Sequence, residues 1–221
     1  MGAALCEFRA VAAPAYQRGD LCLWRKRADL TTLAIEDPAH QFGVTGGAAV
    51  FRATSSPCHG AGAAGARGYP DLLDDDWLWG GSLEKIEVTV RHGTRNVTDA
   101  DAPFSQMPAV GEFLPHDESA SITEYVLSLF GRDRDAAMAK TGSQFFADNC
   151  VACHGDDGTG DRMQGAPDLT DAIWLYGGDR EVIAETIDEA RFGVMSGWSP
   201  RLSDAEVKAV TLYVYQPGGG E

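Results

Sequence analysis

The sequence lacks any run of apolar residues close to the ~18 that a membrane-spanning helix requires, and its first residues do not form a basic region followed by an apolar core. Basic residues are also scarce, since 18 Lys and Arg stand against 33 Asp and Glu, for a formal charge of −15. Such a surface repels nucleic acid and anionic lipid. We therefore expect no nucleic-acid partner, and we expect membrane attachment only through a complex or through an anchor missing from this chain.

The sequence contains a single complete Cys-x-x-Cys, formed by Cys150 and Cys153, and His154 follows it directly. This is the attachment sequence of a c-type haem. Residues three apart share one face of a helical turn, so both thiols can reach the two vinyl groups of one porphyrin. A zinc site would need two more ligands of similar softness, and a thioredoxin-like redox pair would not need the histidine. We interpret Cys150 and Cys153 as thioether residues and His154 as the proximal iron ligand.

The chain also contains an internal repeat. Gly68–Leu72 (GYPDL) matches Gly165–Leu169 (GAPDL), and Trp77–Gly81 (WLWGG) matches Trp174–Gly178 (WLYGG) at the same offset. Upstream of each pair lies a Cys-His-Gly, and downstream lies a lone methionine and an apolar-periodic closing segment. These elements are Cys58-His59-Gly60, Met107 and Ile122–Leu129 in the first copy, and Cys153-His154-Gly155, Met195 and Val207–Val214 in the second. Strand signals are sparse, so the repeat predicts two similar helical domains.

We predict an all-α fold of two tandem cytochrome c-like domains, residues 41–131 and 136–221, after an irregular N-terminal segment of residues 1–40. A polar linker, residues 131–136, joins the domains. Helices that are apolar on one face need a hydrophobic wall, and a haem supplies it in a domain of under a hundred residues. Ser203 and Glu206 predict a capping box at the start of the last helix. Among the remaining cysteines, Cys6 and Cys22 could pair.

Three stretches together resemble the dihaem c subunit, subunit III, of cbb3-type cytochrome c oxidases: Tyr69–Gly81, Ser105–Pro108 and Cys150–Gly155. The likeness covers about residues 41–221. It implies two haem c cofactors and an electron-transfer role, from a donor cytochrome c to the catalytic subunit of the oxidase. It also implies the catalytic and monohaem subunits as partners, and a place on the periplasmic face of the bacterial inner membrane.

The resemblance also implies that Met107 and Met195 are axial iron ligands, with Met195 expected on the haem of His154. In a helical protein, a methionine is otherwise usually core filler. His59 is expected to ligate the first haem. The family has a cysteine where this chain has Ser55, and a hydroxyl does not form a thioether, so Cys58 is at most the single tether of that haem.

Histidine–methionine ligation leaves no open coordination position and raises the reduction potential, which favours electron transfer. We therefore expect a subunit that is not catalytic by itself; the alternatives are a free soluble dihaem carrier and, less favoured, a peroxidase-type haem enzyme. The acidic excess lies beyond residue 29 and predicts docking of a basic donor cytochrome c. The other histidines, His40, His92 and His116, are expected to be packing or surface residues. The tryptophans Trp77, Trp79, Trp174 and Trp198 are expected to form walls of the haem pockets.

Overall fold

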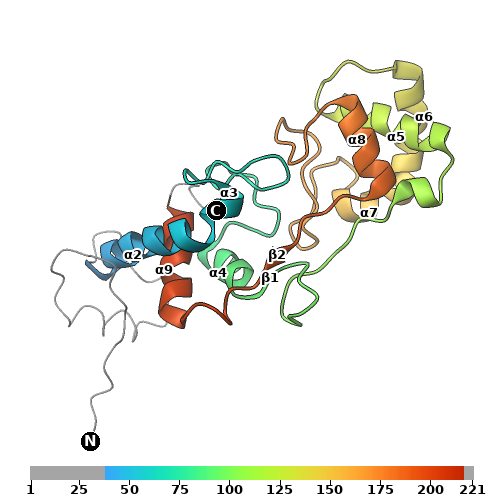
Figure 1. Ribbon diagram of the computed structural model, residues 1–221. Coiled ribbons are helices and arrows are strands. Elements are labelled where there is room, and N and C mark those ends of the chain that lie inside the picture. Colours follow the sequence, from blue (N-terminus) through green and yellow to red (C-terminus); the bar gives the residue numbers. More distant parts are fainter. Residues whose placement is uncertain (1–37, 217–221) are drawn as a thin grey trace, which may run out of the picture.

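The structure is a computed structural model that describes residues 38–216 (Figure 1). Predictions for residues 1–37, among them the pairing of Cys6 with Cys22, lie outside the described residues. Within the described range the chain is mainly helical, as the all-α prediction requires. The helices are α2 (Pro38–Thr54), α3 (Ser56–His59), α4 (Leu83–His92), the 3-10 helix η2 (Val110–Glu112), α5 (His116–Leu129), α6 (Ala136–Asn149), α7 (Val151–His154), α8 (Arg180–Glu189) and α9 (Asp204–Tyr215).

Two of these boundaries bear on the predictions. Helix α2 begins at Pro38, so residues 38–40, which were expected to be irregular, are helical. Helix α9 begins with the predicted capping box, in which Ser203 accepts the Glu206 N–H and the Glu206 side chain accepts the Ser203 N–H. None of the helices in residues 38–216 is both long and apolar enough to cross a membrane.

The helices form two packing units, and each unit combines helices from both sequence repeats. Helix α2 packs on α9, and α4 packs on α9, in what we call the first unit (α2, α3, α4 and α9). Helix α5 packs on α6 and α8 in the second unit (η2, α5, α6, α7 and α8). Figure 1 shows the two groups side by side, with α2 and α9 crossing in one and α5, α6 and α8 together in the other.

Each unit has its own hydrophobic core. In the first unit, Phe51 of α2 is fully buried together with Val207 and Val210 of α9. In the second, Ile122 of α5 is buried together with Phe146 of α6 and Ile183 of α8. The apolar faces predicted for the two closing helices are therefore buried as expected, but each packs against the first helix of the other repeat.

Two glycines allow these helix pairs to approach closely. A Cβ atom on Gly47 of α2 would lie 2.0 Å from the Ala209 carbonyl oxygen of α9, and one on Gly142 of α6 would lie 1.8 Å from the Ser121 carbonyl oxygen of α5. No side chain fits such a gap, so the backbones are in direct contact. The two crossings are equivalent in the repeat, and both join helices of different repeats.

A buried carboxylate fixes α5 in the second unit. Glu124 is 6% exposed. It accepts the Asp135 N–H at the start of α6, with 2.6 Å between nitrogen and oxygen, and it forms an ion pair with Arg180 of α8. Since α5 and α6 are joined by only a few residues, they pack as an antiparallel hairpin.

The two units meet where the chain crosses between them. Strand β1 (Gly93–Thr94) pairs antiparallel with β2 (Met195–Ser196), with Thr94 opposite Met195. The chain leaves the first unit after β1, builds the second unit, and returns through β2 to α9. The predicted bounds 41–131 and 136–221 thus follow the repeat of the sequence, whereas the packing units of the structure exchange their closing helices.

Candidate haem-binding sites

The two Cys-His motifs form equivalent one-turn helices. In α3, the amides of Cys58 and His59 donate to the Ser55 carbonyl oxygen at 3.1 and 2.9 Å. In α7, the amides of Cys153 and His154 donate to the carbonyl oxygen of Cys150 at 3.1 and 3.0 Å. Ser55 and Cys150 also have similar backbone angles, φ −102° and −116°. Ser55 therefore occupies the position of the first thioether cysteine, with the same backbone and a different side chain.

Both histidines are oriented by a backbone carbonyl. The Nδ1 atom of His59 lies 3.0 Å from the Pro70 oxygen, and that of His154 lies 3.2 Å from the Pro167 oxygen. A ring that donates from Nδ1 leaves Nε2 with its lone pair for a metal. Burial also lowers the pKa of His154, although the bond to Pro167 opposes this. The imidazole is thereby kept neutral, as a ligand must be.

The three cysteines of these motifs are free thiols in the structure. Cys58 is exposed, while Cys150 and Cys153 are half-buried. Burial, together with the neighbouring Cys153, raises the pKa of Cys150 to about 11. Gln164 lies against this motif, because its Oε1 is 3.5 Å from the Cys153 sulfur and its Nε2 donates to the Ala152 carbonyl.

Met107 lies in the second unit, with His154. It packs on the core cluster that also contacts Cys150 and Val151. Two residues before it, the Ser105 hydroxyl donates to the Gln164 carbonyl oxygen. The loop that carries Met107 is therefore tied to the loop that follows the Cys150–His154 motif.

Met195 lies on the side of the first unit. It belongs to β2, which pairs with β1 at the end of α4. Three residues later, the Trp198 N–H donates to the Val90 carbonyl oxygen of α4 at 3.0 Å, and the Trp198 ring packs on the core of the first unit. The structure thus brings Met107 to the unit of His154, and it pairs the strand of Met195 with β1 at the end of α4. The placement of Met195 with His154 stays a prediction.

The surroundings of both motifs fit a haem. Large apolar side chains near the histidines and methionines are exposed, among them Tyr69 (49%), Phe104 (55%) and Val194 (61%). Trp77 Nε1 is buried and has no partner within residues 38–216, whereas the equivalent Trp174 Nε1 donates to the Asp171 carbonyl. An unpaired buried N–H costs about 1–3 kcal/mol. A macrocycle with carboxylate groups would cover the apolar surface and offer an acceptor.

The four tryptophans lie in the first unit, in the second unit or between the two units. Trp77 and Trp198 pack on the core of the first unit, and Trp174 packs on that of the second. Trp79 lies instead between the units, where a Cβ on Gly165 would be 2.3 Å from its ring. Its repeat equivalent Tyr176 lies in the same way 3.5 Å from the Cβ position of Gly68. One aromatic ring of each repeat therefore packs against a glycine of the other.

Carboxylates of both repeats gather beside these loops. The pKa of Asp76 is raised to about 6, first by burial and then by repulsion from Asp171, Asp74 and Asp168. The pKa of Asp171 is also raised, first by burial and then by Asp168 and Asp75. This acidic cluster is part of the charge excess that the composition indicated.

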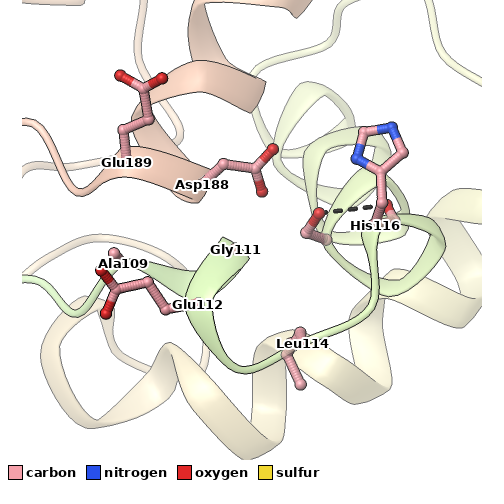
Figure 2. A pocket seen from close by; sticks show the side chains of 8 residues that line it. Ala109, Gly111, Glu112, Leu114, His116, Asp188 and Glu189 are labelled. Carbon is pink, nitrogen blue, oxygen red and sulfur yellow. Dashed lines mark hydrogen bonds between the residues drawn. The ribbon is translucent and has the colours of Figure 1, made fainter.

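The remaining histidines have packing partners or lie away from the motifs. His92 Nδ1 is 3.0 Å from the Asp99 carboxylate, and His40 is buried at 5% exposure. His116 lines a separate pocket of about 490 Å³ between η2, the start of α5 and the end of α8 (Figure 2). Asp188 points into this pocket in Figure 2, and none of the predicted haem ligands lines it.

Two histidine sites of this geometry, each with a methionine loop and an apolar surround, define a dihaem c-type cytochrome. Comparison with known families agrees. The family model for cytochrome c matches residues 44–130. The family model for cytochrome c oxidase, cbb3-type, subunit III matches residues 137–214.

Individual relatives make the assignment specific. The chain is 54% identical over 195 residues to the cbb3-type cytochrome c oxidase subunit CcoP of Cereibacter sphaeroides, covering 87% of this chain and 67% of the relative. It is 47% identical over 203 residues to CcoP of Rhodobacter capsulatus (87% and 68%), and 46% identical over 176 residues to FixP of Azorhizobium caulinodans (79% and 60%). The chain belongs to the subunit III family of cbb3-type cytochrome c oxidases, whose two cytochrome c domains carry two haem c. It spans about two thirds of the length of these relatives or slightly less.

Proposed function

We propose that this chain passes electrons from a basic donor cytochrome c to the catalytic subunit of a cbb3-type oxidase, on the periplasmic face of the bacterial inner membrane. The other partners are then the catalytic and monohaem subunits of the complex. The observation that carries the proposal is the pair of equivalent imidazoles, each with Nδ1 bonded to a proline carbonyl and Nε2 left for iron. A haem in each site supplies reversible one-electron chemistry.

The axial ligands are His59 with Met195 in the first unit, and His154 with Met107 in the second. This pairing is supported by the bond from Ser105 to Gln164 and by the pairing of β2 with β1. Methionine as sixth ligand raises the reduction potential and leaves no coordination position for a substrate. The chain is accordingly an electron carrier within the complex and not a catalyst by itself.

For electron transfer, the protein groups around each haem site must hold the iron ligands in place. The bonds to Pro70 and Pro167 hold the imidazole planes. The hydrophobic core of each unit keeps water from one side of its site. Cys150 and Cys153 are the two tethers of the second haem, and Cys58 is the single tether available to the first. The acidic cluster around Asp76 is suited to attract a basic donor.

The ligand pairing can be tested because Ser55 makes the haems spectrally different. A haem with one thioether retains a vinyl group, so its reduced pyridine adduct absorbs at longer wavelength than that of a haem with two. We expect Met107→Ala to open the two-thioether haem to carbon monoxide and to lower its potential. Met195→Ala should do the same to the other haem.

The reverse assignment, in which Met195→Ala opens the two-thioether haem, would contradict the exchange of ligands. Carbon monoxide binding to one haem of the unsubstituted protein would contradict the electron-carrier role and favour a haem enzyme. Met163→Ala is the matched control, because Met163 is 77% exposed and lies in neither methionine loop.

A further inference from the structure

Arg95 lies directly after β1, where the chain crosses from the first unit to the second. Its guanidinium donates to three backbone carbonyls that are far apart in the sequence. Nε is 2.9 Å from the Ser105 oxygen, Nη2 is 3.0 Å from the Gly165 oxygen, and Nη1 is 3.4 Å from the Gly193 oxygen. Ser105 and Gly193 each lie two residues before a methionine. One side chain therefore holds both methionine loops.

The positive charge of Arg95 is not neutralised nearby. The side chain is half-buried, and burial lowers its pKa. Within residues 38–216 it forms no ion pair with a carboxylate, and the titratable group beside it is the Tyr176 hydroxyl, whose pKa is raised by burial. The guanidinium carbon lies 5.2 Å from the centre of the Trp79 ring, which packs on Gly165. A buried cation is normally paired with an acid, so the three carbonyls and the ring must stabilise this one.

The backbone of Arg95 is also fixed in an unusual conformation. Its φ is +52°, in the left-handed region that side chains other than glycine rarely adopt. Its N–H donates to the Pro103 carbonyl at 2.8 Å, which closes the loop between β1 and Ser105. Strain of this kind persists where the surroundings impose it and is concentrated at functional positions.

We propose that Arg95 is a positioning residue that holds both axial methionines and couples the two haem sites. The role rests on the ligation by Met107 and Met195 proposed above. The bonds to the Ser105 and Gly193 oxygens each fix the backbone two residues before a methionine, which would limit how far that sulfur moves from a bound iron. One side chain thereby makes the two ligand loops depend on each other.

The charge of Arg95 has a second consequence. Ferric haem carries one more positive charge than ferrous haem, so an uncompensated cation close to both sites disfavours the ferric form. The potentials of both haems are therefore expected to be higher with Arg95 than without it. The partial burial of the side chain strengthens this effect, because buried charges are screened less than exposed ones.

Arg191 provides a matched control from the same region. Its guanidinium carbon lies 5.0 Å from the centre of the Tyr176 ring, as Arg95 lies over Trp79. However, it pairs with Glu185 and bonds to Val182 and Thr186, all in helix α8, which ends just before it. The charge of Arg191 is therefore compensated by a carboxylate, and its side chain bonds to neither methionine loop.

The test uses the haem-loaded chain and the substitutions Arg95→Gln, Arg95→Lys, Arg191→Gln and Arg191→Lys. The readouts are the two midpoint potentials, the far-red charge-transfer band of methionine-ligated ferric haem, and carbon monoxide binding to the ferrous protein. Arg95→Gln should lower both potentials, weaken the band and raise carbon monoxide binding several-fold at both haems. Arg95→Lys should retain more of the potential, because it keeps the charge, but should still bind carbon monoxide. The Arg191 variants should leave both haems unchanged.

Unchanged potentials and ligand binding in Arg95→Gln, or a change at one haem only, would overturn the coupling role. If Arg95→Gln does not fold, the same readouts on Arg95→Lys decide, with unchanged carbon monoxide binding counting against the proposal. A wild-type protein without the methionine band would contradict the proposed ligation, and with it the role of Arg95. A wild-type protein that has the band, with Arg95 variants that behave like it, would contradict the role of Arg95 alone.

Discussion

The two haem units have the same helical arrangement, yet only the second is built from a continuous stretch of chain. The first combines α2, α3 and α4 with α9, which returns about a hundred residues later, whereas the second runs from η2 to α8 without interruption. Their chemistry differs as well, since Ser55 stands where the second unit has Cys150. The difference teaches that a repeat in the sequence does not by itself define which helices pack together.

Two fragments of the chain, one packing unit and one sequence repeat, should show most clearly which of the two is stable by itself. A fragment of residues 104–194 keeps α5, α6 and α8 together with His154 and Met107. A fragment of residues 136–216 keeps one whole repeat but loses the partner of α6 and the partner of α9. We expect the first to melt cooperatively as a helical haem protein, and the second to be poorly helical and to aggregate through the exposed face of α9. Circular dichroism and gel filtration measure both properties. Equal stability of the two fragments would contradict the exchange of closing helices between the units.

The elements themselves were predictable from local patterns. The periodicity of Ile122, Val126 and Leu129 predicts a buried helix face, and the structure buries two of these side chains in the core. The Ser203–Glu206 box was also confirmed. The partner of each face was not predictable in this way, because periodicity marks which side of a helix is apolar and not what covers it. The few residues between α5 and α6 were a usable signal, since short connections favour neighbouring helices.

The haem motifs were located by their spacing, and their placement on equivalent turns agrees with the repeat. Arg95 was missed, because no motif surrounds it and its role depends on three carbonyls brought together by the fold. The ion pair of the buried Glu124 with Arg180 was missed for the same reason. Long-range polar contacts of this kind follow from tertiary structure, and their residues look like ordinary surface charges in the sequence.

Gly142→Ala tests the close crossing of α5 and α6. Because the added Cβ would lie 1.8 Å from the Ser121 carbonyl oxygen, the helices must separate, and we expect a loss of about 1–3 kcal/mol in the free energy of unfolding. Thermal unfolding followed at the two-thioether haem measures the effect. Gly62→Ala is the control, since a Cβ there meets no atom within 4 Å. A Gly142→Ala protein as stable as the wild type would show that this contact is absent in solution.

Ser55→Cys should remove the chemical difference between the two sites. The Ser55 backbone already matches that of Cys150, so a thiol at this position can form the second thioether. We expect the absorption band of the reduced pyridine adduct to shift to the wavelength of a haem with two thioethers. Ser56→Cys, one residue along, should leave the band where it is. A shift in neither variant would mean that the first site does not attach haem through position 55.

Asp76→Asn should give the smallest effect, and its sign depends on pH. The pKa of Asp76 is about 6 in the fold against an ordinary value of 3.8, so ionisation is harder in the folded protein. Its contribution to stability is therefore most favourable below about pH 4, declines as pH rises through 6, and is unfavourable at pH 7 to 8. Asparagine does not ionise and avoids this loss.

We expect Asp76→Asn to raise the free energy of unfolding by roughly 1 kcal/mol at pH 7.5, a value reduced for solvent screening of this half-buried group. At pH 4 the gain should vanish. Thermal melts at both pH values measure it, and Asp156→Asn, at an exposed carboxylate outside the acidic cluster, is the control. Added salt should shrink the gain, because Asp171, Asp74 and Asp168 contribute to it by repulsion. A gain that is equal at both pH values would show that ionisation is not its cause, and that carboxylates of the two repeats do not interact where the units meet.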